Sequence, residues 1–273
     1  MIPRDNPLDA ALGERRSAKT GRARPVTETL VFAWRAILKI KHNPEQAFDM
    51  VASPIMFTVL FTYLFGNVIA GSPEAYLAFL LPGIMMQTVL FSCVHTGYTL
   101  NQDIARGVFD RFRALPIWRP APIAGAIVGD FARYTISAAL VLAVGFLMGY
   151  RPAGGPASIL VALVLLNLFA FGIGWVFTAL ALAMRSGGTM MTVSWLFLMP
   201  ITFGSNIYVE PATMPPWLAA FAQANPVSLI VTALRTTLDG APDARAIALA
   251  LAAPALVAAV FAPLTMRLYA KER

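Results

Sequence analysis

Residues 158–184 read SILVALVLLNLFAFGIGWVFTALALAM, and none of these 27 side chains carries a charge. A helix that crosses a membrane needs about 20 mainly apolar residues, so this stretch is long enough for one. A transmembrane strand would alternate apolar and polar residues, and this stretch does not alternate. Because backbone amides in lipid must be hydrogen-bonded within the segment, we expect a membrane-spanning helix here.

The composition extends this expectation to the whole chain. Of its 273 residues, 58% are hydrophobic and 13% are charged, whereas soluble domains carry roughly a quarter charged residues. This excludes a soluble domain and a disordered chain, and the single cysteine, Cys93, excludes an internal disulfide and a multi-cysteine metal site. We predict an all-α polytopic membrane protein with six transmembrane helices. The predicted spans are residues 51–69, 76–100, 122–148, 158–184, 189–208 and 246–268.

The basic residues indicate an orientation. They are concentrated before the first span, between spans 2 and 3, and at the end of span 6, whereas the opposite side has only Arg151, Arg235 and Arg245. By the positive-inside rule we expect both termini to be cytoplasmic, in a multi-pass protein of a bacterial plasma (inner) membrane. The net charge of +7 is then explained by topology and by attraction to anionic membrane lipids, so no nucleic acid partner is expected.

The chain before the first span divides into two parts. Residues 1–24 are rich in Arg, Ala and Pro without apolar periodicity, and we expect a disordered basic cytoplasmic tail. From Thr27 to about Lys41, Leu30 and Trp34 fall on one helical face and Arg35 on another. This helix is too short and too charged to span, so we predict that it lies in the membrane interface. The simpler interpretation is a lead-in to span 1.

Residues 101–120, between spans 2 and 3, carry alternating charges. Asp103, Arg106, Asp110 and Arg113 follow one another at spacings of three and four, which places opposite charges on neighbouring helical turns. Pro116 ends this pattern. We predict a short cytoplasmic helix with exposed aromatic side chains, on which a partner docks. The alternative is a solvated loop whose arginines only set the topology.

Two longer stretches resemble a known family. Residues 107–133, GVFDRFRALPIWRPAPIAGAIVGDFAR, are similar to the cytoplasmic loop and following helix of type-2 ATP-binding-cassette permeases, above all the membrane subunits of daunorubicin-resistance-like exporters. Residues 209–235, VEPATMPPWLAAFAQANPVSLIVTALR, resemble the extracellular segment between the last two spans in that family. The resemblance covers residues 25–273, which it implies to be one type-2 ABC transmembrane domain.

The resemblance implies a permease subunit of an ATP-driven exporter. It implies pairing with a second permease copy, as a homodimer or a pseudo-dimer, and with two copies of a separate cytoplasmic ABC ATPase. ATP and Mg would be bound by that ATPase, because residues 13–20 only approach a Walker A loop, with Ala18 in place of its second glycine. The chain itself is expected to bind no cofactor or metal and to have no ATPase site. The residues implied to form the ATPase-coupling helix are Arg106, Gly107, Asp110, Arg111, Phe112 and Arg113.

Two further features are interpreted with the resemblance. Prolines and glycine divide residues 209–243, and we predict short helices over 216–223 and 227–238 that dip into the outer leaflet; a plain outer loop is the alternative. Asp130 and Arg133 lie one helical turn apart near the cytoplasmic end of span 3, where we expect a structural ion pair rather than a direct role in transport.

Polar residues are scarce in spans 2 and 5, which flank the central path in the resembling family. The candidate lining residues are Gln87, Ser92, His95, Thr96, Thr192, Thr202, Ser205 and Asn206. For any one of them, hydrogen bonding between helices is the simpler interpretation.

We therefore expect export of an amphipathic drug, lipid or glycolipid-like compound by alternating access. The main alternative is an ATPase-independent secondary transporter or channel, which would usually show paired acids within the spans or broken half-repeats. An intramembrane enzyme would need a reactive cluster, and neither His42 nor His95 lies in such a pattern.

Overall fold

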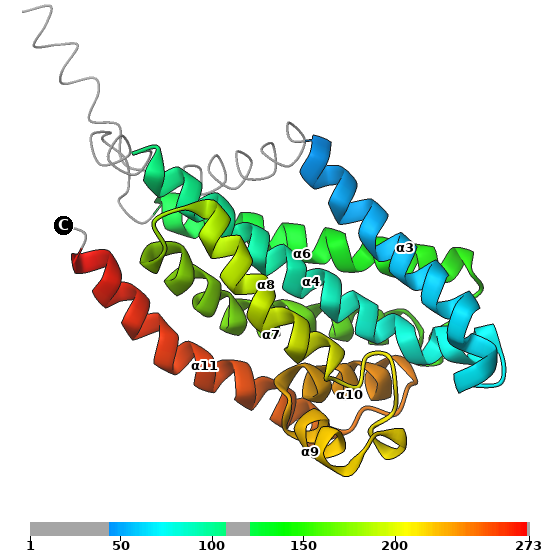
Figure 1. Ribbon diagram of the computed structural model, residues 1–273. Coiled ribbons are helices and arrows are strands. Elements are labelled where there is room, and N and C mark those ends of the chain that lie inside the picture. Colours follow the sequence, from blue (N-terminus) through cyan, green and yellow to red (C-terminus); the bar gives the residue numbers. More distant parts are fainter. Residues whose placement is uncertain (1–43, 108–120, 272–273) are drawn as a thin grey trace, which may run out of the picture.

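The computed structural model describes the backbone of residues 44–107 and 121–271 and the side chains of residues 52–107 and 129–268. Within these ranges the secondary structure is helical, and no strand is present (Figure 1). The long helices are α3 (Pro44–Ile69), α4 (Pro73–Ala105), α6 (Ala121–Leu147), α7 (Gly155–Ala183), α8 (Gly187–Phe203) and α11 (Ala244–Lys271). The short ones are the 3-10 helix η1 (Pro211–Thr213), α9 (Pro216–Ala224) and α10 (Pro226–Leu238).

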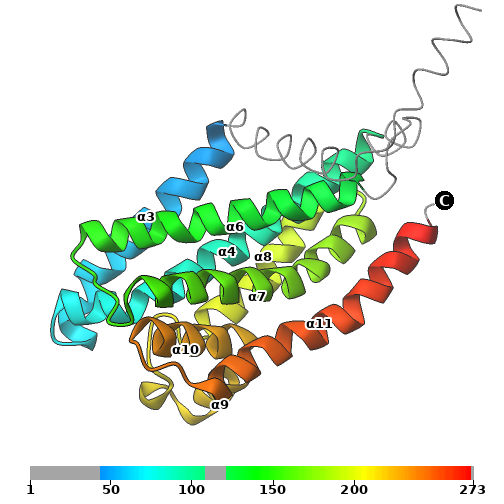
Figure 2. The ribbon, with the colours of Figure 1, turned by 180° about the vertical axis from the view of Figure 1, so that it is seen from behind.

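Helix α4 forms the centre of the bundle. It packs against α3, α6, α7, α8 and α10, and most of its residues are buried. Helix α11 runs along α7 on one side, as the view from behind shows (Figure 2). The helices alternate in direction. One end of the bundle, here named the 107–121 end, therefore holds the last residues of α4, α7 and α11 and the first residues of α6 and α8. The opposite end holds α9 and α10 and is named the α10 end.

Among the described helices, five are long and apolar enough to cross a membrane: α3, α4, α6, α7 and α11. They coincide with five of the six predicted spans. The remaining predicted span, residues 189–208, differs, because helix α8 ends at Phe203. Its 17 residues measure only about 25 Å, just short of a hydrocarbon core of about 30 Å. The bent pair α9–α10 also qualifies if counted as one broken span, so the count of six spans stays a prediction.

Helix α8 ends early because the residues after it bond to α10. Ser205 donates to the carbonyl of Thr202, 2.5 Å away, which closes the last turn. The backbone N–H of Asn206 donates to Ser228 Oγ of α10 at 3.0 Å, and its side-chain amide donates to Thr232 Oγ1 at 2.9 Å. These bonds replace the helical ones, so the chain leaves the helix and lies against α10.

The two predicted short helices are present as α9 and α10, which meet at an angle of 74°. Asn225 makes the bend, since its side-chain oxygen accepts a bond from the backbone N–H of Val227 (2.9 Å) and so caps α10. Its amide also donates to the carbonyl of Ile201 in α8, 2.7 Å away. The bend is thereby attached to the bundle, while its depth in the outer leaflet stays a prediction.

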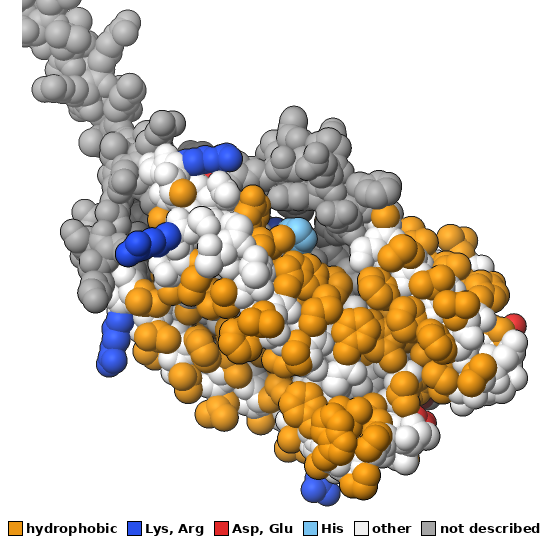
Figure 3. Space-filling model, viewed as in Figure 1, with side chains coloured by type: hydrophobic (Ala, Val, Ile, Leu, Met, Phe, Trp, Pro, Cys, Tyr) orange, Lys and Arg blue, Asp and Glu red, His pale blue; other side chains and the backbone are white. Residues whose placement is uncertain are grey.

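A large apolar surface surrounds the bundle. Exposed hydrophobic side chains lie on α3, α7, α8 and α11, and Figure 3 shows them spread over one broad face, with Lys and Arg mostly toward the 107–121 end. A surface of this kind is suited to lipid rather than to water. The predicted tail and interfacial helix, over residues 1–41, lie outside the described residues.

Candidate functional site

A polar cluster joins α4 to α6 within the apolar bundle. Ser92 and Thr96 of α4 face Asp130, Arg133 and Ser137 of α6. Arg133 donates to both Asp130 and Thr96 through the same nitrogen, Nη2. The Thr96 hydroxyl has two acceptors within reach, Asp130 Oδ1 at 3.2 Å and the carbonyl of Ser92 at 3.1 Å. Ser92 and Ser137 are within hydrogen-bond distance at 3.2 Å. The predicted ion pair between Asp130 and Arg133 is confirmed, and it bonds across to the neighbouring helix.

Helical spacing explains how each half of this cluster forms. Ser92 and Thr96 are four residues apart, and Asp130, Arg133 and Ser137 are spaced by three and four, so each set lies on one face of its helix. The pair is largely shielded, since the Arg133 side chain is 14% exposed and that of Asp130 is 25% exposed. Tyr134 of α6 adds its hydroxyl at 3.3 Å from Thr96 Oγ1. The cluster therefore balances its charges internally at the junction of α4 and α6.

A second polar group lies nearer the α10 end. The Tyr208 hydroxyl donates to Gln87 Oε1 in α4 at 2.6 Å, and the Tyr76 hydroxyl donates to the carbonyl of Tyr208 at 2.9 Å. All three side chains are buried. These two bonds attach the segment after α8 to the central helix α4 at two positions along it, Tyr76 and Gln87.

Arg235 of α10 lies in a junction of three chain segments. Its Nε donates to the carbonyl of Phe79 in α4 (2.9 Å), and its Nη2 donates to the carbonyls of Asn206 (2.7 Å) and Ile207 (3.3 Å). Its guanidinium also lies 3.6 Å from the centre of the Phe79 ring. Pro82 lacks the N–H that would bond the carbonyl of Ala78, so α4 has one helical hydrogen bond fewer next to the Phe79 carbonyl that Arg235 bonds.

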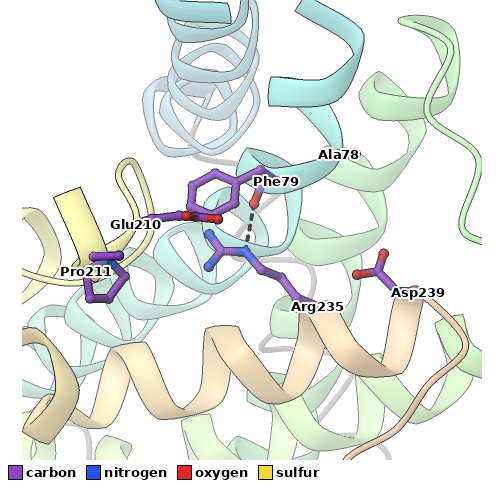
Figure 4. Close-up of a pocket in the computed structure, with 7 residues that line it drawn as sticks. Ala78, Phe79, Glu210, Pro211, Arg235 and Asp239 are labelled. Carbon is purple, nitrogen blue, oxygen red and sulfur yellow. Dashed lines mark hydrogen bonds between the residues drawn. The ribbon is translucent and has the colours of Figure 1, made fainter. Parts of the chain in front are cut away.

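A shallow pocket of about 440 Å³ lies beside this junction. Figure 4 shows Arg235 pointing toward Phe79, with Glu210 and Asp239 on either side. Both acids are exposed, and Pro211 adds an apolar wall. Nearby, in the turn after α6, burial raises the pKa of Tyr150 to about 12, with a smaller contribution from the negative charge of Asp239. Among the described residues, no group of three or more His, Cys, Asp or Glu is placed to bind a metal ion.

The predicted path residues do not share one surface within the chain. Ser92 and Thr96 face α6, Gln87 faces Tyr208, and Asn206 bonds to α10, while Ser205 bonds to the carbonyl of Thr202 at the end of α8. The other three lie apart: His95 is half-buried on α4, Thr192 is exposed and donates to the carbonyl of Gly188 at 3.1 Å, and Thr202 is buried. Their role as path lining stays a prediction.

The predicted coupling residues are described only in part. Arg106 is the C-cap of α4, and Gly107 follows it with a positive φ of 63°. Asp110, Arg111, Phe112 and Arg113 lie outside the described residues. The ends that flank them, Ala105 of α4 and Ala121 of α6, lie at the same end of the bundle.

The family model described as "ABC-2 type transporter" matches residues 27–238. The chain belongs to the ABC-2 type transporter family. A daunorubicin resistance ABC transporter permease protein of Streptomyces coeruleorubidus is 43% identical over 251 residues, which are 92% of this chain and 89% of that protein. Putative transport permeases of Porphyra purpurea and Cyanophora paradoxa are each 23% identical over 77% of this chain and 73% of their own length.

Sequence reasoning on this ABC-2 permease missed two groups. Arg235 was noted only for topology, yet it makes three bonds to backbone carbonyls. A lone arginine in the last turn of an otherwise apolar-striped helix was the available signal. Tyr134 and Ser137 were missed because each sits among apolar residues of α6, and only the packing against α4 reveals their partners.

Proposed function

We propose that this chain is the permease subunit of an ATP-driven exporter that moves an amphipathic drug, lipid or glycolipid-like compound out across the plasma membrane. The observation that carries the proposal is the 43% identity, along 92% of the chain, to a permease whose name assigns it to daunorubicin resistance. The apolar surface of the long helices supports a multi-pass arrangement, in which residues 25–273 form the transmembrane domain and residues 1–24 a cytoplasmic tail.

The energy would come from a separate cytoplasmic ABC ATPase, present in two copies and binding ATP and Mg. Its docking element would be the coupling helix from Arg106 to Arg113, between the end of α4 and the start of α6. A second copy of the permease, making a homodimer, would supply the other half of the path. Closure of the two ATPases would displace the coupling helices and shift the path between inward-open and outward-open states.

Charge supports placing the 107–121 end in the cytoplasm. Arg106, Arg185 and Arg267 follow or end helices at that end. The α10 end is richer in acids, with Glu74, Glu210, Asp239 and Asp243 beside Arg151, Arg235 and Arg245. A basic inner side and a neutral-to-acidic outer side agree with the positive-inside rule. Both termini would then be cytoplasmic.

Co-purification tests the partnership. The tagged permease, extracted from native membranes, is expected to bring down a Walker-motif ATPase in a two-to-two ratio. The variants Asp110→Asn and Arg111→Ala are expected to insert in the membrane as wild type does. They are expected to lose either the bound ATPase or the stimulation of its ATP hydrolysis by the permease. Glu74→Gln, which also alters one charge but at the α10 end, serves as the matched control.

Transport tests the function itself. Inverted vesicles that contain the complex are expected to accumulate daunorubicin with ATP and not with a non-hydrolysable analogue. Unchanged accumulation in the Arg111→Ala variant would contradict the coupling role. Accumulation by the purified permease alone, driven by an ion gradient, would favour the ATPase-independent transporter or channel instead.

A further inference from the structure

We propose that the cluster of Thr96, Asp130 and Arg133, here named the α4–α6 clamp, fixes α4 and α6 into one rigid hairpin that carries displacement of residues 106–120 into the bundle. The inference rests on the proposed function, since it concerns how a partner's movement would reach the core. The three side chains act as positioning residues, which hold two helices in register; in this proposal Thr96 bonds to α6 instead of lining the path.

The position of the clamp fits this role. Thr96 lies nine residues before Ala105, the end of α4, and Asp130 lies nine residues after Ala121, the start of α6. At a rise of about 1.5 Å per residue, both are roughly 13 Å from the segment that joins the helices. The clamp therefore joins the two helices at one level, about two and a half turns from the end at which residues 106–120 connect them.

The chemistry of the clamp opposes separation of the two helices. Thr96 Oγ1 accepts from Arg133, and it lies 3.2 Å from Asp130 Oδ1 and 3.1 Å from the carbonyl of Ser92, so a hydroxyl of α4 bonds to the charged pair of α6. If α4 separated from α6, Asp130 and Arg133 would remain in an apolar bundle without their hydrogen bonds to the Thr96 hydroxyl. Ser92 and Ser137 add a second contact at 3.2 Å, about one turn further in. Charged groups facing lipid or an apolar core are strongly disfavoured, so the hairpin resists splitting.

The contact between α4 and α8 is different. It includes apolar contacts, such as that of the rings of Phe91 and Trp195, whose centres lie 4.7 Å apart, and near its end Tyr98 and Gln102 of α4 lie close to Gly187 of α8. Gly97 of α4 also lies against Met190 of α8, where an added Cβ would come within 2.3 Å of the methionine Cε. Apolar contact is not directional, so it fixes the relative position of two helices less strictly than hydrogen bonds to a charged pair do. Movement would therefore occur between α8 and the hairpin, not within the hairpin.

Two further hydrogen bonds, both from Asn101, add part of α7 to this rigid unit. Asn101 of α4 donates to the carbonyls of Ala181 and Met184 at the end of α7, at 2.8 Å each. This attaches the last turn of α7 to the same end of α4. The unit that responds to residues 106–120 is then the α4–α6 hairpin together with the 107–121 end of α7.

A disulfide that replaces the clamp provides the test. In a Cys93→Ala background, Ser92→Cys and Ser137→Cys place two thiols where hydroxyls now lie 3.2 Å apart. Cross-linking is expected to leave ATP-driven transport by the reconstituted complex at the level of the same double-cysteine protein in its reduced form, because the hairpin moves as one body. Transport that is lost on oxidation and regained with a reductant would show that α4 and α6 must separate, which overturns the proposal.

A rescue experiment separates a positioning role from a purely structural one. Asp130→Asn is expected to lower transport by roughly two- to thirtyfold, the range typical of residues that carry coupling, while ATP hydrolysis and subunit assembly persist. The cross-link is expected to restore transport in this variant. Failure of the rescue, with assembly intact, would refute the clamp. Glu74→Gln, which removes an exposed carboxylate from α4 at the α10 end, is the control.

Two measurements keep the test decisive if a variant fails. Should Asp130→Asn not accumulate in membranes, Thr96→Val removes only the bridging hydroxyl and is assayed in its place. The cross-link yield between positions 92 and 137 is expected to be the same with and without an ATP analogue. Wild-type protein that shows no ATP-driven transport would refute the proposed function, and a yield that falls with nucleotide would refute the clamp on its own.

Discussion

Arg235→Met is the sharpest test of how the α10 end is held together. The substitution keeps an unbranched apolar stem and removes the guanidinium that bonds the carbonyls of Phe79, Asn206 and Ile207. A hydrogen bond from a charged donor contributes about 1.5–3 kcal/mol. The two shorter bonds, at 2.9 Å and 2.7 Å, form the main part of this contribution. Water in the adjacent pocket can replace part of it, so we expect a net loss of about 3 kcal/mol.

Thermal unfolding in detergent measures this loss. For a chain of this size, 1 kcal/mol lowers the melting temperature by about 2–4 °C, so Arg235→Met is expected to melt roughly 6–12 °C below wild type. Helix content should be unchanged, because the apolar stripe of α10 remains. Residues 204–215 are expected to become more sensitive to protease, since they lose their attachment to α4.

Two further variants show whether the loss of stability comes from the hydrogen bonds of Arg235 or only from the loss of an arginine. Arg235→Lys keeps the charge but cannot reach the carbonyls of α4 and of residues 206–207 together, so an intermediate melting temperature is expected. Arg245→Met removes an exposed arginine at the same end and is expected to change little. A melting temperature of Arg235→Met within about 2 °C of the Arg245→Met value would refute the reasoning.

Three further predictions concern single side chains and are checked by the same unfolding assay. Tyr208→Phe leaves the buried Gln87 oxygen without its donor and is expected to cost about 1–3 kcal/mol. Tyr150→Phe removes a buried hydroxyl that has no hydrogen-bond partner among the described residues, so little change is expected at pH 8. The pKa of Tyr150 is about 12 in the folded protein and 10.0 for the reference side chain, so between pH 10 and 12 the hydroxyl loses its proton more readily in the unfolded chain. Wild type should therefore lose stability over this pH range, and Tyr150→Phe should lose less. Equal losses of stability in the two proteins would contradict this. Gly172→Ala would place a Cβ 2.5 Å from Pro254 of α11 and is expected to lower the free energy of unfolding by about 1–3 kcal/mol. In Gly174→Ala the added Cβ meets nothing within 4 Å, so stability should be unchanged or higher. Equal effects of the two substitutions would refute the close packing of α7 on α11.

The short helices at the α10 end illustrate how far local patterns reach. The prolines and the asparagine between residues 211 and 226 predict helices over 216–223 and 227–238. In the structure, α9 and α10 begin and end within one residue of these predicted limits. The same reasoning extended the preceding span to Tyr208, although α8 ends at Phe203. Nothing local marks that end except a glycine at 204, because the bonds that end the helix go to Ser228 and Thr232, more than 20 residues away.

The sequence by itself determined that this chain lies in a membrane, where its long helices run, and that Asp130 and Arg133 form a pair. These properties depend on residues within a few turns of one another, so apolar run length and helical spacing are sufficient. Only the tertiary structure decided that Thr96 completes that pair and that Arg235 holds α4 and the segment after α8 together. Those contacts depend on how each helix is rotated against its neighbours. That rotation results from the packing of all the helices, and an apolar span shows almost the same composition on every face.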